Sequence, residues 1–531
     1  MEEENKGPVD RRSLLKLIGT VAGSTVMYQA MDSLGFAAQS DFTGPVSLPG
    51  DPKGASVLVL GAGWGGMVAA YELGKAGYKV TMLEYNDRVG GRNWTLYGGD
   101  TYTELGGITQ HVQFDQGHYL NPGPWRIPHH HRGIIHYANM LNVALEPFCQ
   151  TNYAAYVHSV DAFGGTPKRY REVQADFNGY IAETLAKATS QNKLDMPVSQ
   201  EDKEILLDAM KEWGALDKNY EYKKGLITSA RRGFDKEPGG GLDAVPAASQ
   251  PIAMRDLFKS GLWRSIMSGH NYDMQNMMFQ PVGGMGQIGK AFGRKLGNVV
   301  QYNSKVTKIQ QDDKGVTVTY VDAKKGGAPQ QVHADWCVCN IPASVLSQIP
   351  INVGAPMKRA IDSLHHPTTI KVGLQFKRRF WEQDEAIYGG ITYTDQIIRT
   401  IAYPNYNFGS DGPGVILGAY TGGENAYYLS AMAPEDRIKV ALDCGAKIHP
   451  QYRKEFQTGV AVAFSRVPWM LGGIPPWTDE MRAEHYNNLC QIYGRIVMVG
   501  EHVSYLTGWQ EGAILSSLDA IKRLHKRVLS A

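Results

Sequence analysis

The sequence contains only five cysteines in 531 residues, an odd number whose spacing fits neither a disulfide framework nor a metal site. Cys337 and Cys339 lie two positions apart on an expected strand, so we predict that both pack on one side as small hydrophobic groups. Neither sign of charge dominates, because 54 basic residues face 52 acidic ones and the formal net charge is +2. This balance gives no support for nucleic-acid binding or for a polybasic membrane surface.

Long hydrophobic runs are also missing. No segment reaches the roughly 18 apolar residues that a membrane-spanning helix needs, so we expect no stable insertion into a membrane. Hydrophobic residues make up 43% and charged residues 20% of the chain, which is typical of a globular enzyme and not of a disordered or fibrous protein. No internal repeat is evident, and the length allows two or three domains with a large core.

The first 40 residues differ from the rest of the chain. Residues 10–16, Asp-Arg-Arg-Ser-Leu-Leu-Lys, precede a mild apolar run at 17–27, and small residues follow at 35–38. The pattern resembles a twin-arginine export signal, which carries proteins already folded around a cofactor; a charged, disordered N-terminus is the alternative. We therefore expect a periplasmic or secreted protein, or a cytoplasmic one if the signal is not used. A proline-rich linker follows at 41–53.

The segment 56–92 organises the chain. An apolar run at 57–60 predicts a buried parallel strand, and a G-x-G-x-x-G pattern, a helix and a second strand at 79–83 follow. The first glycine permits a tight turn, the second lets the backbone approach a pyrophosphate, and the third lets helix and strand pack closely. A glycine pattern alone is often an ordinary turn, but here the strands and a terminal acid agree. The segment predicts dinucleotide binding by Gly61, Gly63, Gly66 and Glu84.

The motif R-x-G-G-R at 88–92 indicates which dinucleotide binds. It places two guanidinium groups around a flexible glycine pair, and arginine forks suit phosphate oxygens, although a solvated turn is the alternative. With this motif the sequence resembles the FAD-containing amine oxidase family, whose members carry E-x-x-x-R-x-G-G-R directly after the glycine pattern. The resemblance implies FAD as the cofactor, bound in part by Arg88, Gly91 and Arg92.

The resemblance covers about residues 54–529 and implies an α/β (α+β) fold. It implies a Rossmann-like FAD-binding domain (54–110, 275–350 and 480–531), a mixed-sheet substrate-binding domain (111–150 and 351–479) and a helical subdomain (151–274). Local patterns predict helices at 134–145, 176–190 and 200–213, strands at 332–341, 368–380, 414–421 and 495–499, and a loop at 238–250 that could border an entrance.

Later motifs return to the cofactor by the same resemblance. The backbone near Val306 is expected to reach the adenine, and Glu501 to bind the ribityl or phosphate region. Gly512 and Ala513 are expected to direct helix N–H groups at the negative charge of the reduced flavin.

Arg126 lies in the motif G-P-W-R-I-P and is the most informative residue for the substrate. A substrate α-carboxylate needs a permanently charged fork, which arginine supplies; a surface ion pair is the alternative. By resemblance, this motif marks the carboxylate-binding arginine of flavin L-amino-acid oxidases. Family positions further imply that Tyr420 donates to the same carboxylate and that the Gly508 carbonyl accepts from the substrate amine. Trp125, Ile474 and Trp509 are expected to line the substrate cavity.

Lys371 interrupts an apolar strand, where a buried lysine is costly unless it has partners. In the family the matching lysine holds a water near flavin N5, where it assists oxygen chemistry or imine hydrolysis; an outward-facing lysine is the alternative. The consecutive residues His129, His130 and His131 are not expected to face one metal ion together, so we predict no metal site.

The sequence therefore predicts oxidative deamination of L-amino acids by hydride transfer to FAD, with O2 reduced to H2O2 and release of a 2-oxo acid and ammonia. Since no acidic residue stands out in the matched motifs, we expect broad specificity for hydrophobic side chains. The alternatives are an amino-acid 2-monooxygenase that gives an amide and CO2, an amine oxidase, and a non-catalytic FAD-binding redox protein. We also expect a homo-oligomer. The predicted catalytic residues are Arg126, Lys371, Tyr420 and Trp509.

Overall fold

The computed structural model describes residues 42–194 and 197–530, so the expected twin-arginine leader lies outside the described residues. The predicted strand–helix–strand unit is confirmed as β1 (Ser56–Leu60), α3 (Trp64–Lys75) and β2 (Lys79–Leu83). Both strands run parallel, as the crossover through a helix requires. In the described part of the chain, none of the helices is both long enough and apolar enough to cross a membrane.

A six-stranded sheet contains this unit, in the order β13-β2-β1-β17-β24-β23. Alternate residues of β1 enter two different cores, because side chains of a strand point to opposite faces. Val57 and Val59 pack with α3 and α19 (Gln510–Leu529), whereas Leu58 and Leu60 pack with Cys337 on the other face. The other strands are β13 (Val300–Gln301), β17 (Trp336–Cys339), β23 (Ile492–Tyr493) and β24 (Ile496–Met498).

Two sequence predictions of element boundaries are wrong. The strand expected at 332–341 is two strands, β16 (Gly326–Ala334) and β17, because Asp335 between them accepts hydrogen bonds from Ser56 N and Oγ at 2.7 Å. The helix expected at 134–145 is α4 (Arg132–Met140) and ends earlier, where Asn142 takes a positive φ of 53°. Leu145 begins β7 (Leu145–Cys149), which pairs with β12 (Met277–Pro281).

A seven-stranded sheet forms the second layer, in the order β22-β18-β21-β20-β19-β8-β9. Strands β18 and β21 form an antiparallel pair, of which the sequence predicted the two strands but not the pairing, and β22 lies on the other side of β18. Strands β8 and β9 come from the range expected to be helical, so that range also contributes to the sheet. The strands are β8 (Tyr156–His158), β9 (Lys168–Arg169), β18 (Thr369–Phe376), β19 (Ile391–Thr394), β20 (Thr400–Ala402), β21 (Gly414–Gly422) and β22 (Phe456–Ala463).

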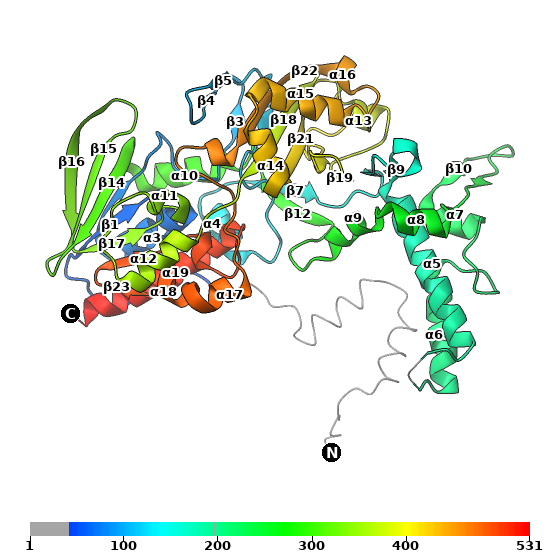
Figure 1. Cartoon of the computed structure of the whole chain (residues 1–531), viewed down its shortest axis with the longest axis horizontal. Helices are drawn as coiled ribbons and strands as arrows, with labels where there is room; N and C mark the ends of the chain where they lie inside the picture. Colours follow the sequence, from blue (N-terminus) through cyan, green and yellow to red (C-terminus); the bar gives the residue numbers. More distant parts are fainter. Residues whose placement is uncertain (1–41, 195–196, 531) are drawn as a thin grey trace.

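The predicted helices at 176–190 and 200–213 are confirmed as α5 (Tyr170–Ser190) and α6 (Gln200–Gly214). Figure 1 shows them as an arm that extends away from the two sheets. A buried ion pair of 2.8 Å between Asp176 and Arg232 joins α5 to α7 (Leu226–Arg232). The rest of this region contains β10 (Phe234–Lys236), β11 (Ala247–Ala248), α8 (Met254–Ser260) and α9 (Trp263–Met267).

Smaller elements connect these parts, and one of them is a three-stranded sheet, β14-β15-β16, beside the six-stranded sheet (Figure 1). The strands are β3 (Leu96–Tyr97), β4 (Thr101–Thr103), β5 (Thr109–His111), β6 (Tyr119–Leu120), β14 (Ser304–Gln311) and β15 (Val316–Asp322). The helices are α10 (Gly286–Leu296), α11 (Ala343–Leu346), α12 (Ala355–Ser363), α13 (Phe380–Gln383), α14 (Gly423–Ser430), α15 (Pro434–Gly445), α16 (Tyr452–Glu455), α17 (Asp479–Met481) and α18 (Asn487–Cys490).

Candidate active site

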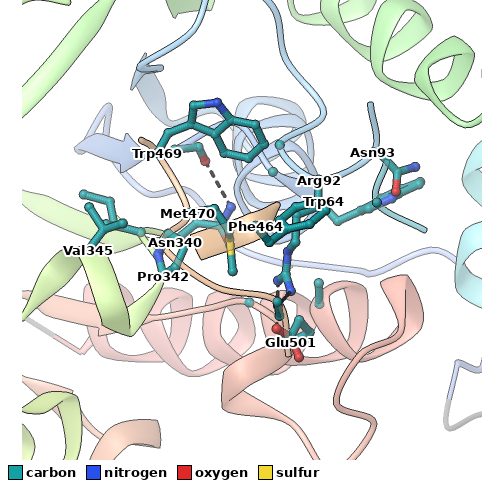
Figure 2. Close-up of a pocket in the computed structure, with 18 of the residues that line it drawn as sticks. Trp64, Arg92, Asn93, Asn340, Pro342, Val345, Phe464, Trp469, Met470 and Glu501 are labelled. Carbon is teal, nitrogen blue, oxygen red and sulfur yellow. Dashed lines mark hydrogen bonds and ion pairs between the residues drawn. The ribbon is translucent and has the colours of Figure 1, made fainter. Parts of the chain in front are cut away.

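A cavity of about 790 Å³ is lined by residues of both large sheets and of the loops that follow their strands. Its lining extends from the turn after β1 to the start of α19, and Figure 2 shows part of it. This volume lies in the upper part of the range for ligand sites in proteins. The loop at 238–250 contributes no residue to the lining, so the structure does not place it at this cavity.

The turn after β1 forms one end of the cavity. Glu84 is only 4% exposed, and its carboxylate accepts hydrogen bonds from the backbone N–H groups of Ala62 at 2.6 Å and Asn86 at 2.8 Å. Burial raises the pKa of Glu84. The hydrogen bonds act in the opposite direction, because they favour the ionised form. A Cβ on Gly63 would come within 2.8 Å of Asn340 Nδ2, so a larger residue here would require the Asn340 side chain to move.

Gly66 and Arg88, both predicted to bind the cofactor, do not line the cavity. A Cβ on Gly66 would lie 2.0 Å from the Gly61 carbonyl oxygen, so this glycine permits the predicted close packing of α3 on β1. The Arg88 guanidinium lies 5.0 Å from the Trp94 ring and 5.2 Å from the Trp469 ring, and donates to the Gly91 carbonyl at 3.0 Å. These contacts hold Arg88 in the loop, away from the cavity.

Arg92 lines the cavity and contacts residues from two later segments of the chain. It forms an ion pair of 2.8 Å with Glu501 and donates to the Gly473 carbonyl at 2.6 Å (Figure 2). The other Glu501 oxygen accepts a hydrogen bond from Gly508 N at 2.9 Å. Glu501 therefore links Arg92 to the loop that contains Gly508 and Trp509. Val306 and Ala513 also line the cavity. Gly512 does not, because it packs against the Leu506 carbonyl, 2.2 Å from where a Cβ would be.

Several buried polar groups of the cavity lining have no hydrogen-bond partner among the described residues. They are Trp64 Nε1, both amide atoms of Asn93 and Gln510 Nε2. Buried polar atoms are nearly always paired in folded proteins, so these atoms are suited to a polar ligand. With the open glycine turn and Glu84 at the position expected to bind a ribose, they fit a long dinucleotide such as FAD.

Arg126 is at the opposite end of the cavity. Its guanidinium lies 4.9 Å from the Trp125 ring and 5.8 Å from the Trp509 ring, and its Nη2 is 3.6 Å from Met274 Sδ. Arg126 Nε is buried without a partner, and within the described ranges no carboxylate pairs with this side chain. Burial lowers the pKa of Arg126. The site therefore presents a desolvated cation with no acid of its own.

Lys371 lies beside Arg126 and is 2% exposed, which excludes an outward-facing lysine. Its Nζ donates to the carbonyl of Asn121 at 3.2 Å and to that of Gly123. Burial, and to a smaller extent Arg126, hold the pKa of Lys371 well below its usual range, which favours the neutral amine. Burial raises the pKa of Tyr420, so its phenol stays protonated and able to donate.

The Gly508 backbone has a φ of +81°, which glycine adopts without strain. A Cβ there would come within 3.1 Å of Ile474 Cδ1, so Gly508 and Ile474 are neighbours in the cavity lining. The structure thus brings together the residues predicted for the substrate end of the site: Trp125, Arg126, Lys371, Tyr420, Ile474, Gly508 and Trp509.

Comparison with known proteins identifies the family of this chain. Residues 64–524 match the family described as flavin containing amine oxidoreductase. The chain belongs to this family. The prediction of FAD as cofactor is confirmed, and so is the assignment to the oxidoreductases. A curated relative, the L-amino-acid oxidase of Vipera ammodytes ammodytes, is 30% identical over 482 residues, which cover 88% of this chain and 92% of the relative. The L-amino-acid oxidase of Siganus canaliculatus is 27% identical, with 89% and 86% covered.

Solved structures of amine oxidases share the fold of this family member. Cyclohexylamine oxidase from Brevibacterium oxydans IH-35A matches with a TM-score of 0.59 and 17% identity, over 90% of this chain and all of the other. A putrescine oxidase variant matches with a TM-score of 0.57 and 18% identity, over 90% and 99%. At these identities the likeness concerns the fold alone.

Sequence reasoning missed several residues of this flavoprotein's site. Met274 and Phe464 line the cavity without belonging to any recognisable motif, and Asp273 accepts a hydrogen bond from Trp509 Nε1 at 3.2 Å. As expected, the three consecutive histidines do not all lie in one cluster, but two of them do. His130 and His131 lie with Asp273 in a group whose ligating atoms are within 4.8 Å of one another. No sequence pattern pointed to Asp273 as their neighbour.

Proposed function

We propose that the protein is an L-amino-acid oxidase, which converts an L-amino acid and O2 into a 2-oxo acid, ammonia and H2O2. The observation that carries the proposal is Arg126, a partly buried cation at the cavity with no acidic partner in the described residues. A substrate α-carboxylate supplies the missing charge through a charge-assisted, two-pronged hydrogen bond. Both curated relatives described above are L-amino-acid oxidases and support this assignment.

The residues around Arg126 orient the amino acid. The Tyr420 phenol donates to the same carboxylate, and the Gly508 carbonyl accepts from the neutral substrate amine, which fixes the direction of the Cα–H bond. When bound, FAD would supply the acceptor for the hydride from Cα and the route of two electrons to O2. Lys371, whose pKa burial lowers, would hold a water near the reacting atoms, and the faces of Trp125 and Trp509 would exclude other water from the site.

The cavity favours hydrophobic amino-acid side chains. Within the described residues only two acidic residues line it, Glu84 and Glu501; Glu84 receives backbone hydrogen bonds in the turn after β1, and Glu501 is paired with Arg92. Neither is available to a basic substrate side chain, and a charge buried without a partner is costly. Apolar side chains of the lining include Leu105, Trp125, Met274, Phe464, Leu471 and Ile474.

A substrate and product assay tests this proposal. The FAD-loaded enzyme is mixed with L-Leu, L-Phe, L-Lys and the amines that correspond to their decarboxylation, and H2O2, 2-oxo acid and amide are measured separately. We expect equal amounts of H2O2 and 2-oxo acid from L-Leu and L-Phe, and little from L-Lys. Amide without H2O2 would identify a monooxygenase, and H2O2 from the amines alone would identify an amine oxidase; either result contradicts the proposal.

A further inference from the structure

Two consecutive histidines and a distant aspartate converge beside Trp509. His130 Nε2 lies 3.5 Å and His131 Nε2 3.9 Å from the same oxygen, Asp273 Oδ1. Ligand atoms around one zinc ion have similar separations, since bonds of about 2.0–2.2 Å in a tetrahedral arrangement place them about 3.3–3.6 Å apart. The structure thus brings three donor atoms of suitable type to nearly the separations that one ion requires.

The donor atoms of this cluster are left without hydrogen bonds. His131 is fully buried, and neither of its ring nitrogens has a partner in the described part of the chain. His130 Nε2 and Asp273 Oδ1 are also buried and unpaired, since their contact lacks hydrogen-bond geometry.

We propose that His130, His131 and Asp273 bind one divalent transition-metal ion of the zinc class. Two imidazole nitrogens and one carboxylate oxygen suit such an ion, and three protein ligands leave a fourth position open to water. Asp273 is oriented for this role, because its other oxygen, Oδ2, accepts from Trp509 Nε1 and leaves Oδ1 for the ion. Carboxylates that bind metals are commonly held by such a second hydrogen bond.

The proposed ion would connect the substrate end of the cavity to two distant segments. It would tie the residues before β12, which include Asp273 and Met274, to the turn before α4. Met274 contacts Arg126, and Asp273 holds the Trp509 ring, so both walls of the substrate end depend on these segments. The proposed metal site does not depend on which substrate the enzyme oxidises. Its test can therefore fail or succeed independently of the test of the proposed function.

Metal binding can be measured on the FAD-loaded enzyme after chelator treatment and dialysis. Equilibrium dialysis against Zn²⁺ should give one ion per chain, and the thermal midpoint should rise with Zn²⁺ at constant FAD, because the ion binds only the folded state. Co²⁺ should bind at the same site and give visible absorption at wavelengths beyond the oxidised flavin bands. His130→Gln and Asp273→Asn should each weaken Zn²⁺ binding more than about 100-fold, since even outer-shell partners of metal ligands are worth about 10–100-fold.

The third histidine of the run provides the matched control. His129→Gln should keep full Zn²⁺ binding, because His129 is outside the cluster. His130→Gln leaves the hydrogen bond between Asp273 and Trp509 in place, so its loss of zinc cannot come from a displaced Trp509. The flavin absorbance of each variant reports that it is folded and loaded. The proposal is overturned if the wild type retains no stoichiometric Zn²⁺, if the two ligand variants bind it as the wild type does, or if His129→Gln weakens binding equally.

Discussion

Lys371 and Tyr420 are paired directly across the antiparallel strands β18 and β21, and Lys371 Nζ lies 4.7 Å from the centre of the Tyr420 ring. The Trp125 ring is at a similar distance of 4.9 Å on another side of the amine. This enclosure by aromatic rings and two backbone carbonyls allows a lysine to be buried next to Arg126. The same contacts hold the Lys371 amine at the substrate end of the cavity, on a strand of the seven-stranded sheet.

Replacing Lys371 should slow catalysis more than substrate binding. We expect Lys371→Met to lower kcat by about 100-fold or more, because a positioned group that assists proton transfer contributes about 10²–10⁴-fold. Stopped-flow measurements should show slower reoxidation by O2, with anaerobic reduction by L-Leu less affected. Lys377→Met is the control, because Lys377 lies just beyond β18 and is exposed. Wild-type reoxidation in Lys371→Met would exclude a role for the lysine in oxygen chemistry.

The same lysine should make stability depend on pH. Its pKa is lowered in the folded protein and close to 10.5 in the unfolded chain, so between these values only the unfolded chain binds the proton. Stability therefore rises with pH across this window, and the cost of burying Lys371 is greatest below the folded-state pKa. The gain in Tm of Lys371→Met over the wild type should be largest at low pH and shrink towards pH 10.5. A gain that is constant with pH would show that the folded-state pKa is not lowered.

Arg126 should discriminate amino acids from amines. We expect Arg126→Met to lower kcat/KM for L-Leu by about 10- to 100-fold, since hydrogen bonds to charged groups are worth about 1.5–3 kcal/mol. Activity towards the decarboxylated amine should not fall, because that compound has no carboxylate to bind. Arg132→Met, at an exposed position at the start of α4, should change neither value. Equal losses for L-Leu and for the amine would mean that Arg126 does not bind the carboxylate.

Two glycines of α3 should respond oppositely to alanine. A Cβ on Gly66 meets the Gly61 carbonyl oxygen at 2.0 Å, whereas a Cβ on Gly74 meets nothing within 4 Å. Gly66→Ala should therefore destabilise the protein by more than about 1–3 kcal/mol and reduce its FAD content. Gly74→Ala should be neutral or stabilise by up to about 1 kcal/mol, because alanine favours the helix. Thermal midpoints and the ratio of flavin to protein absorbance provide the measurements.

Export through the leader stays a prediction, because residues 1–41 lie outside the described part of the chain. If the twin-arginine signal is used, changing Arg11 and Arg12 together to lysine should leave the protein in the cytoplasm of a bacterial host. Lys16→Arg, which keeps the arginine pair, should export normally. Immunoblots of periplasmic and cytoplasmic fractions measure the distribution, and unchanged export of the double variant would contradict the prediction. The expected homo-oligomer likewise stays a prediction.

Local patterns allowed the sequence to determine the cofactor-binding unit. The bounds of β2, the start of α6 and the glycine turn agree with the structure, because strand periodicity, helix caps and turn residues act over a few positions. Family motifs likewise identified the residues at the substrate end, since each motif keeps its residues at fixed spacing. Arg126, Lys371 and Tyr420 were therefore predictable one at a time, though not their mutual distances.

Only the tertiary structure decided which of these residues meet and which do not. Arg88 and Arg92 share one motif, yet Arg88 stays between two indole rings while Arg92 reaches Glu501. Asp273 lies more than 140 positions from His130 in the sequence. No local pattern indicates that the segment before β12 and the turn before α4 meet in the fold. Burial, which shifts the pKa of Lys371, also depends on contacts with segments distant in sequence. Local interactions act between near neighbours in the chain, whereas the environment of each reactive group comes from packing between distant segments.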